Sequence, residues 1–415
     1  MIDEAERNIE QVQIPRWGKV EKSDGTIPWL VVDEDLVPVE PIRRFLLDFV
    51  ARGNRPWSVR SYAYDLLRWW RWLRVYEIDW ERATSAESRD LVLWMMRADK
   101  PRNAARTKSR TTVGTVNVIT RKRYLDDRYC ARTIRHSNAV VRAFYEFWIE
   151  RGEGPLVNPM PVARGAARVN AHHNPLEPFR PGGRLRYNPK LPVQRPRSIP
   201  DDRWLELFGA LRSNRDRALL ALAVSNGARA AEILGISLED IDWGDQLIRV
   251  TRKGTRVDQW LPASPEAFVW LRLHLADLGT SLDVNGSLWL TLRRRSDSSA
   301  ALEYRPLTYD ALRKVLTRAN DVLGTNWTMH DLRHTAAIRM AHDGTLTSRD
   351  IQTILGHAHL STTTEIYLVE DQDDTIRRVQ HHLAHRAEHM ISNPPTVAAG
   401  YDSADLNVLF GAVES

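Results

Sequence analysis

The chain has 415 residues, enough for two domains with extensions, and its 43% hydrophobic and 27% charged content is typical of globular proteins. No apolar run approaches the ~18 residues of a membrane span, and the acidic, polar N-terminus lacks the basic start and apolar middle of a signal peptide. The single cysteine, Cys130, excludes an internal disulfide and a metal site built from cysteines, so we expect a cytoplasmic protein.

The first half of the chain is predicted to be an arm followed by a helical domain. In residues 1–40 a Ser-Asp-Gly-Thr turn signal separates two apolar stretches, which indicates an extended or hairpin-like arm that could bind accessory sites or pack on the core. Apolar residues then recur at helical spacing and predict a helical domain over 41–151, with helices at 42–49, 58–74, 86–96 and 133–150. Its tryptophans follow the apolar stripes, so we interpret them as core residues.

The net charge of +6 is concentrated in two stretches. Basic residues dominate from Arg97 to Arg135, and Glu177 is the one acidic residue between Arg164 and Arg197. Such clusters suit double-stranded DNA, because each phosphate contact adds salt-dependent affinity, although a solvated basic face that binds nothing specific is equally compatible. Basic residues predicted to contact DNA are Arg60, Arg68, Arg71, Lys108 and Arg110.

The second half begins after a stretch over 152–197 that is rich in Pro, Gly, Asn and Arg, which predicts a basic interdomain linker. A mixed α+β domain is predicted over 198–390, with a tail over 391–415. Strand-like alternation over 240–262, around Lys253 and Gly254, predicts a β-hairpin. The fold class is therefore mainly α with a small sheet, and helices of this domain are predicted at 201–211, 217–224, 265–278, 309–323, 330–342, 348–355, 361–367 and 374–389.

Residues suited to phosphoryl transfer are concentrated in five segments of this domain, at 227–235, 252–254, 330–334, 355–357 and 364–367. Arg229 and Arg333 stay charged at any working pH, and two arginines can hold the nonbridging oxygens of a phosphate in fixed geometry. A tyrosine hydroxyl such as that of Tyr367 needs nearby cations or a base to act as a nucleophile. A lysine at a hairpin tip, Lys253, is a workable general acid.

Two histidines complete this set. His330 and Arg333 are three residues apart, so on a helix they share one face, and His357 follows Gly356 at the end of another helix. Each residue alone has an ordinary structural interpretation. The pair His330 and His334 could bind a metal, but no third ligand with good spacing follows and Arg333 would repel a cation. The joint order and spacing is what points to one active site.

This set resembles the tyrosine recombinase (phage integrase) family over about residues 198–390, and the helical half resembles the family's core-binding domain in character. The six family positions correspond to Arg229, Lys253, His330, Arg333, His357 and Tyr367. One departure is Ala228, where larger apolar residues are common.

The resemblance implies a site-specific recombinase, integrase or transposase. Tyr367 would attack the scissile phosphate and form a 3′-phosphotyrosine. Arg229, Arg333 and His357 would stabilise the charge, Lys253 would protonate the leaving 5′-oxygen, and His330 would assist. It further implies double-stranded DNA as substrate, a homotetramer on two paired sites, a nucleoid-associated location, and no metal, ATP, cofactor, membrane or small-molecule ligand.

Three other functions remain open from the residues alone. A type IB topoisomerase-like enzyme uses almost the same residues, and would relax supercoiled plasmid without a recognition site. A DNA-binding regulator without catalysis would form no covalent complex, and a metal-dependent nuclease would be inhibited by a chelator. The residues do not identify the recognition sequence, any accessory protein, or a phage, transposon, integron or chromosome-resolution role.

Overall fold

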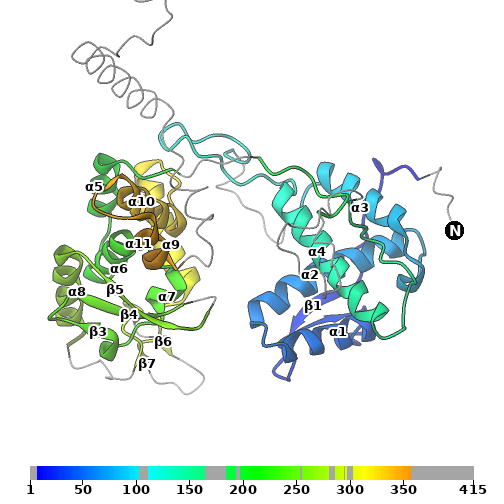
Figure 1. The fold of residues 1–415 in the computed structure, drawn as a ribbon, viewed down its shortest axis with the longest axis horizontal. Helices are drawn as coiled ribbons and strands as arrows, with labels where there is room; N and C mark the ends of the chain where they lie inside the picture. Colours follow the sequence, from blue (N-terminus) through cyan, green and yellow to red (C-terminus); the bar gives the residue numbers. More distant parts are fainter. Residues whose placement is uncertain are drawn as a thin grey trace, which may run out of the picture. The chain divides into compact units, whose positions relative to one another are not determined.

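The protein is described by a computed structural model over residues 7–101, 111–163, 184–192, 197–252, 255–279, 286–293, 295–296 and 302–356. It forms two compact units, Met1–Gln194 and Arg195–Ser415, each with its own core. Both units are mainly helical with small antiparallel sheets (Figure 1). This confirms the predicted fold class, in which the small sheet was placed in the second half of the chain and a hairpin-like arm in the first. Among the helices of the described ranges, none has the length and apolar character needed to cross a bilayer.

The first unit contains a two-stranded sheet, formed by β1 (Lys19–Lys22) and β2 (Trp29–Val32). It also contains the long helices α1 (Glu40–Ala51), α2 (Pro56–Val75), α3 (Ser85–Arg97) and α4 (Ala131–Ile149). The four predicted helices are confirmed, with ends that differ by one or two residues. The strands pair antiparallel, with Lys19 opposite Val32. Trp17, Ile27 and Val31 are buried in the same core as the helices, so the N-terminal arm packs on the core.

Aromatic side chains fill the core of this unit. Trp69, Trp72 and Trp148 are buried, which confirms the prediction that these tryptophans are core residues, whereas Trp57 at the start of α2 is 70% exposed. The indole Nε1 of Trp69 donates to the hydroxyl of Tyr145 at 3.0 Å. Buried Trp and Tyr need such partners for their polar atoms, so this bond helps to fix how α2 packs on α4.

Part of the stretch predicted to be a linker packs on the first unit. Val162 and Leu185 form an antiparallel bridge, and the side-chain amide of Asn138 in α4 donates to that of Asn188 at 3.0 Å. Met160 and Leu185 are buried. The structure therefore assigns 158–163 and 184–188 to this unit, and the basic linker stays a prediction for 164–183 and 193–196, which lie outside the described residues.

The second unit consists of α5 (Asp201–Gly209), α6 (Asn214–Asn226), α7 (Ala230–Leu234), β3 (Ile241–Asp242), β4 (Leu247–Thr251), β5 (Asp258–Pro262), α8 (Pro265–Leu278), β6 (Arg295–Ser296), β7 (Leu302–Glu303), α9 (Tyr309–Leu323), α10 (Met329–His342) and α11 (Ser348–Leu355). Strands β3, β4 and β5 form an antiparallel sheet in that order. The predicted hairpin corresponds to β4 and β5, in which Val250 lies opposite Gln259. The helices predicted at 361–367 and 374–389 lie outside the described residues.

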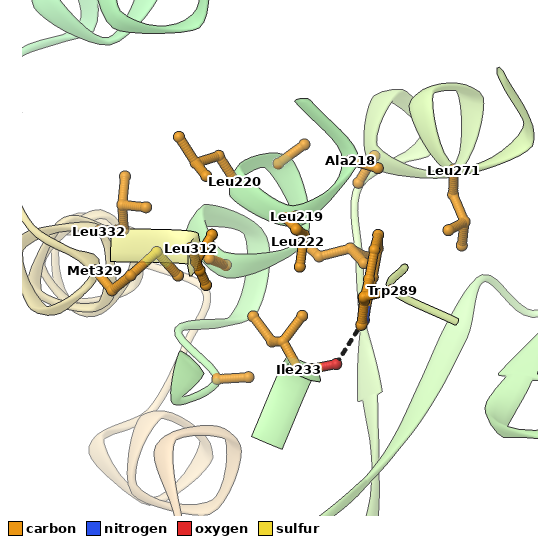
Figure 2. Packing of buried hydrophobic residues seen from close by; sticks show 14 of the residues in the cluster. Ala218, Leu219, Leu220, Leu222, Ile233, Leu271, Trp289, Leu312, Met329 and Leu332 are labelled. Atoms are coloured by element: carbon orange, nitrogen blue, oxygen red, sulfur yellow. Dashed lines mark hydrogen bonds between the residues drawn. The ribbon is translucent and has the colours of Figure 1, made fainter. Parts of the chain in front are cut away.

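Helix α6 is the centre of this unit, because its residues from Ala218 to Val224 are apolar on every side and such a stretch must be buried. Leu219, Leu220 and Leu222 of α6 are fully buried (Figure 2). Trp289 lies in the same cluster, and its indole Nε1 donates to the carbonyl of Ile233 in α7 at 2.7 Å. The core thus fixes both ends of the short connection from α6 to α7, where the first arginine of the predicted site lies.

Candidate active site

The turn between α6 and α7 places Arg229. Helix α6 ends at Gly227, which has a left-handed φ of 68°. The side chain of Asn226 accepts a hydrogen bond from the backbone of Ala228 at 3.0 Å and donates to the carbonyl of Pro262 at the end of β5, also at 3.0 Å. The turn is therefore tied to the sheet before Arg229 begins α7.

Glu232 holds Arg229 by two bonds. Its Oε2 accepts from the backbone N–H of Arg229 and its Oε1 accepts from Nη1 of the same residue, both at 2.9 Å. The Glu232 side chain is 1% exposed and that of Arg229 is 34% exposed. The arginine is therefore fixed at its inner edge and accessible to an anion from outside.

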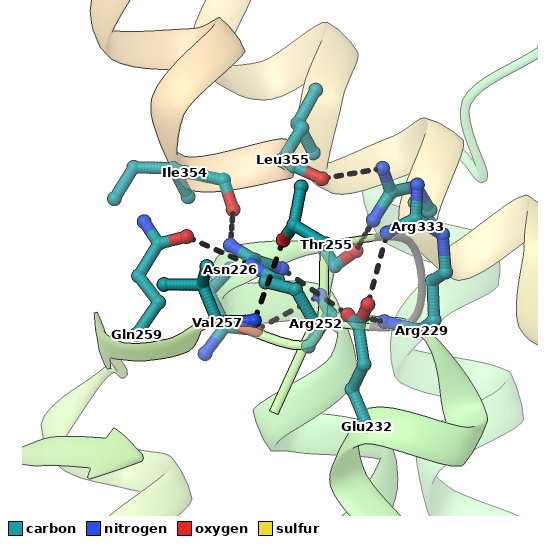
Figure 3. A network of polar contacts seen from close by, with 12 residues as sticks. Asn226, Arg229, Glu232, Arg252, Thr255, Val257, Gln259, Arg333, Ile354 and Leu355 are labelled. Atoms are coloured by element: carbon teal, nitrogen blue, oxygen red, sulfur yellow. Dashed lines mark hydrogen bonds and ion pairs between the residues drawn. The ribbon is translucent and has the colours of Figure 1, made fainter. Parts of the chain in front are cut away.

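Arg333 joins the same turn from α10, which begins with a capping box between Thr328 and Asp331. Its Nη1 donates to the carbonyl of Gly227 at 2.6 Å and its Nη2 to the carbonyl of Leu355 at 2.7 Å. Arg333 is buried, and it thereby ties the turn that precedes Arg229 to the end of α11 (Figure 3). The structure thus brings the two predicted arginines to one turn.

His330 lies in the first turn of the same helix. It is exposed, whereas Arg333 is buried, so the two predicted residues share a helix but differ in depth. The ring of His330 contacts that of His334 edge to face, with centroids 4.3 Å apart. This edge-to-face contact restricts the orientation of the His330 ring at the helix surface.

Arg252 is a central residue of the site to which the sequence analysis gave no role. Its Nη1 donates to Oε2 of Glu232 at 3.1 Å, its Nε donates to Oε1 of Gln259 at 2.8 Å, and its Nη2 donates to the carbonyl of Ile354 (Figure 3). Burial lowers the pKa of Arg252 from its ordinary value, and the carboxylate of Glu232 opposes that shift.

The alternation of β4 does indicate that the side chain of Arg252 points inward. Ile248 and Val250 of β4 point into the core, and a period of two places residue 252 on the same side. An arginine at an inward position requires an acidic partner, and Glu232 provides it.

Three predicted catalytic residues, Lys253, His357 and Tyr367, lie outside the described residues. Two of them adjoin described positions in the chain. Lys253 follows Arg252, and His357 follows Gly356, which ends α11 with a left-handed φ of 62°. Their predicted roles stay predictions.

Of the residues predicted to contact DNA, Lys108 and Arg110 also lie outside the described ranges. The other three make contacts within the first unit. Arg68 bonds to Asp65 and Ser137, and Arg71 donates to the carbonyls of Trp17 and Gly18 at 2.6 and 2.7 Å. Arg60 lies over three aromatic rings, those of Trp29, Trp57 and Tyr64, at 5.1 to 5.4 Å. These three arginines are thus partly used for packing within the first unit.

Comparison with known proteins gives consistent matches. The phage integrase family model matches residues 199–373. Transposase A from transposon Tn554 of Staphylococcus aureus is 24% identical over 366 residues, which cover 83% of this chain and 91% of the transposase. Tyrosine recombinase XerC of Chromobacterium violaceum is 26% identical over 338 residues, which cover 80% and 90% of the two chains. A lambda integrase dimer bound to a core site has a similar fold, with a TM-score of 0.50 at 16% identity over 79% of this chain and 93% of the integrase.

Proposed function

Since the chain belongs to the phage integrase family of tyrosine recombinases, we propose that it is a site-specific recombinase, integrase or transposase that cuts and rejoins DNA through Tyr367. The observation that carries the proposal is the pairing of Arg229 and Arg333 at one turn. Arg333 holds the carbonyl of Gly227, two residues before Arg229. Together they form the proposed phosphate clamp, in which Arg229, 34% exposed, meets a nonbridging oxygen of the phosphodiester and buried Arg333 fixes the turn and adds positive charge beneath it.

In the proposed reaction the hydroxyl oxygen of Tyr367 attacks the scissile phosphorus. The bond from phosphorus to the 5′-oxygen breaks, the 3′-phosphate stays on the tyrosine, and Lys253 gives the leaving 5′-oxygen a proton. Arg229, Arg333 and His357 stabilise the added negative charge, and His330 assists. Attack by a 5′-hydroxyl on the phosphotyrosine reverses these steps, so rejoining needs no ATP.

The proposed substrate is double-stranded DNA, bound by both units and acted on by a homotetramer that pairs two sites. Relatives named a transposase and a tyrosine recombinase support DNA as the substrate, whereas the homotetramer follows from the family resemblance alone. Catalysis is proposed to need no metal, because the cationic side chains take the role that a metal ion has in many nucleases.

The proposal is tested with a pool of nicked duplexes whose sequence is randomised around the nick. Cleavage beside the nick releases a short strand, so the covalent intermediate cannot be rejoined and survives denaturation. We expect the wild-type chain to retain a subset of the pool that shares a sequence. Tyr367→Phe should retain none, whereas Tyr309→Phe, which changes an exposed tyrosine of α9, should behave as the wild type.

Other outcomes would favour other functions. Retention of the whole pool without a shared sequence, together with relaxation of any supercoiled plasmid, would indicate a topoisomerase-like enzyme. Sequence-selective binding without a covalent complex would indicate a regulator, and strand cutting that a chelator abolishes would indicate a metal-dependent nuclease.

A further inference from the structure

We propose that Arg252 is a positioning residue that locks three parts of the active site together, namely the α6–α7 turn, the β4–β5 hairpin and the end of α11. This inference rests on the proposed function and adds a residue outside the six that the family resemblance supplies. Arg252 touches no reacting atom in this proposal. It acts through the residues that it holds.

The Arg252 side chain is buried, with 5% of it exposed. Each nitrogen of its guanidinium donates to a different element, Nε to Gln259 in β5, Nη1 to Glu232 in α7 and Nη2 to the carbonyl of Ile354 in α11. The planar fork of arginine can satisfy three partners in fixed directions, whereas the single ammonium of lysine cannot reproduce that arrangement.

Glu232 links Arg252 to Arg229. One carboxylate oxygen accepts from Arg252 at 3.1 Å and the other from Nη1 of Arg229 at 2.9 Å. The orientation of Glu232 is therefore set from both sides, and Arg252 provides the inner contact. Loss of that contact would let the carboxylate rotate, and the phosphate clamp of Arg229 would rotate with it.

The hairpin also holds the end of α11. Arg252 takes the carbonyl of Ile354, and the side-chain amide of Gln259 donates to the carbonyl of Thr353 at 3.0 Å. The hairpin thus caps the last carbonyls of the helix, where a cation is also favoured by the helix dipole. Gly356 lies directly against Arg252, since a Cβ atom there would be 3.0 Å from Nε. From this point the chain continues to His357 and Tyr367.

These contacts have a consequence for the leaving group. Arg252 is joined by one peptide bond to Lys253, the proposed general acid, so anchoring Arg252 also anchors the backbone from which that lysine extends. Substitution of Arg252 should therefore impair protonation of the 5′-oxygen as well as the phosphate clamp. When the bridging 5′-oxygen of the substrate is replaced by sulfur, the cut strand leaves as a thiolate that needs no proton. Such a substrate therefore separates the effect on protonation from the effect on the phosphate clamp.

The experiment uses the full chain and a nicked duplex of the sequence recovered from the random pool, made with either oxygen or sulfur at the bridging 5′ position. The rate of covalent complex formation is measured in a single turnover for Arg252→Gln, Arg252→Lys, Lys253→Ala and the wild type. The matched control is Arg249→Gln, which removes an arginine of the same strand that pairs with Asp240 at the surface.

We expect Arg252→Gln to react about 100-fold more slowly than the wild type on the oxygen substrate, and Arg252→Lys to be similarly slow despite its charge. On the sulfur substrate both variants should recover at least about tenfold, as Lys253→Ala should. Arg249→Gln should stay within about twofold of the wild type on both substrates.

Two results would overturn the inference. One is an Arg252→Gln or Arg252→Lys variant that reacts at the wild-type rate. The other is a variant that unfolds cooperatively like the wild type and loses the same factor on both substrates, because the hairpin would then have no part in leaving-group chemistry. If Arg252→Gln does not fold, Arg252→Lys decides by the same criteria. Failure of the proposed function is distinguishable, because the wild type itself would then form no complex with either substrate.

Discussion

One buried carboxylate organises the charges of the site at the scale of single residues. Glu232 is 1% exposed and accepts bonds from both Arg229 and Arg252. Arginines brought close together repel one another, and a shared carboxylate between them offsets that repulsion. In the proposed function, Arg229 is thereby fixed before any phosphate arrives, which is the condition under which such donors contribute most to catalysis.

Removal of this carboxylate should destabilise the fold as well as the clamp. Glu232→Ala leaves Arg252 buried without its acidic partner, so we expect the free energy of unfolding to fall by about 3 kcal/mol. The measurement is urea denaturation. Glu239→Ala is the control, because Glu239 pairs with Arg249 at the surface, 3.9 Å away, and should change stability by less than about 0.5 kcal/mol. Equal effects of the two substitutions would contradict the account.

Some residues of the site could be predicted from the sequence and others could not. Arg229 and Arg333 follow from motif and chemistry, and the structure brings them to one turn. Arg252 was not assigned a role, since an arginine beside Lys253 and Gly254 is ordinary for a hairpin tip, and only its inward register distinguishes it. Its bond to Ile354 joins positions 102 residues apart, and no local pattern reports such a contact.

In the second unit the C-terminal ends of α6 and α11 are packed tightly against each other. Gly227 ends α6 in the left-handed region, and a Cβ atom there would lie 2.8 Å from Cδ2 of Leu355 and 3.3 Å from Cβ of Ala336. The ends of α6 and α11 can approach this closely only because residue 227 has no side chain. Because these two helix ends are so close, Arg333 can donate to the carbonyls of both Gly227 and Leu355.

Gly227→Ala tests this packing. The substitution adds both left-handed strain and a steric clash, so we expect a loss of about 1–3 kcal/mol in the free energy of unfolding, accompanied by a loss of covalent complex formation. Gly209→Ala serves as the control, because no atom lies within 4 Å of a Cβ atom at the end of α5. The Gly209→Ala variant should be about as stable as the wild type. A similar loss of unfolding free energy in Gly209→Ala and Gly227→Ala would show that the clash is unimportant.

A second element-scale prediction concerns pH. His274 of α8 is buried, stacks on Trp289 with centroids 5.4 Å apart, and donates to the carbonyl of Leu288. Burial lowers the pKa of His274. The unfolded chain therefore binds this proton more readily than the folded chain, and the stability that the neutral ring supports is lost as the pH falls below about 6.5.

We therefore expect the free energy of unfolding of the wild type to fall more steeply between about pH 7 and about pH 5 than that of His274→Gln, which cannot titrate. Chemical denaturation at a series of pH values measures both slopes. Parallel curves for the two proteins would refute this assignment.

Helices and strands were predicted correctly where the apolar periodicity of the sequence continues over several turns. Helices such as α2 and α9 repeat an apolar face over several turns, and their positions are confirmed within two residues. Strand β3 has only two residues, too few to alternate, and it was not predicted separately from the hairpin. The bridge between Val162 and Leu185 likewise has no periodic signal, so the sequence suggested a linker there.

At the scale of the whole molecule, each of the two units has a large core of its own within the described residues. The aromatic core around Trp69 lies in the first unit and the core around Leu222 in the second. In the proposed function DNA is both held and cut, and two separate cores are compatible with one unit that supplies binding surface and another that carries the phosphate clamp.

Separate cores should unfold separately. We expect Trp69→Ala to reduce amide hydrogen-exchange protection in α1, α2 and α4 while leaving α6 and α8 unchanged, and Leu222→Ala to have the reverse effect. Hydrogen exchange followed by mass spectrometry on the full chain measures both. Loss of protection throughout the chain from either substitution would mean that the cores unfold as one.

The central claim is a covalent bond between DNA and Tyr367, and the most direct measurement locates that bond. The wild-type chain is incubated with the selected nicked duplex in the presence of a chelator, the complex is digested with nuclease and protease, and the nucleotide-bearing peptide is sequenced by mass spectrometry. The account predicts a 3′-phosphate linked to Tyr367 and an undiminished yield with the chelator. A nucleotide attached to any other residue, or no attached nucleotide, would contradict it.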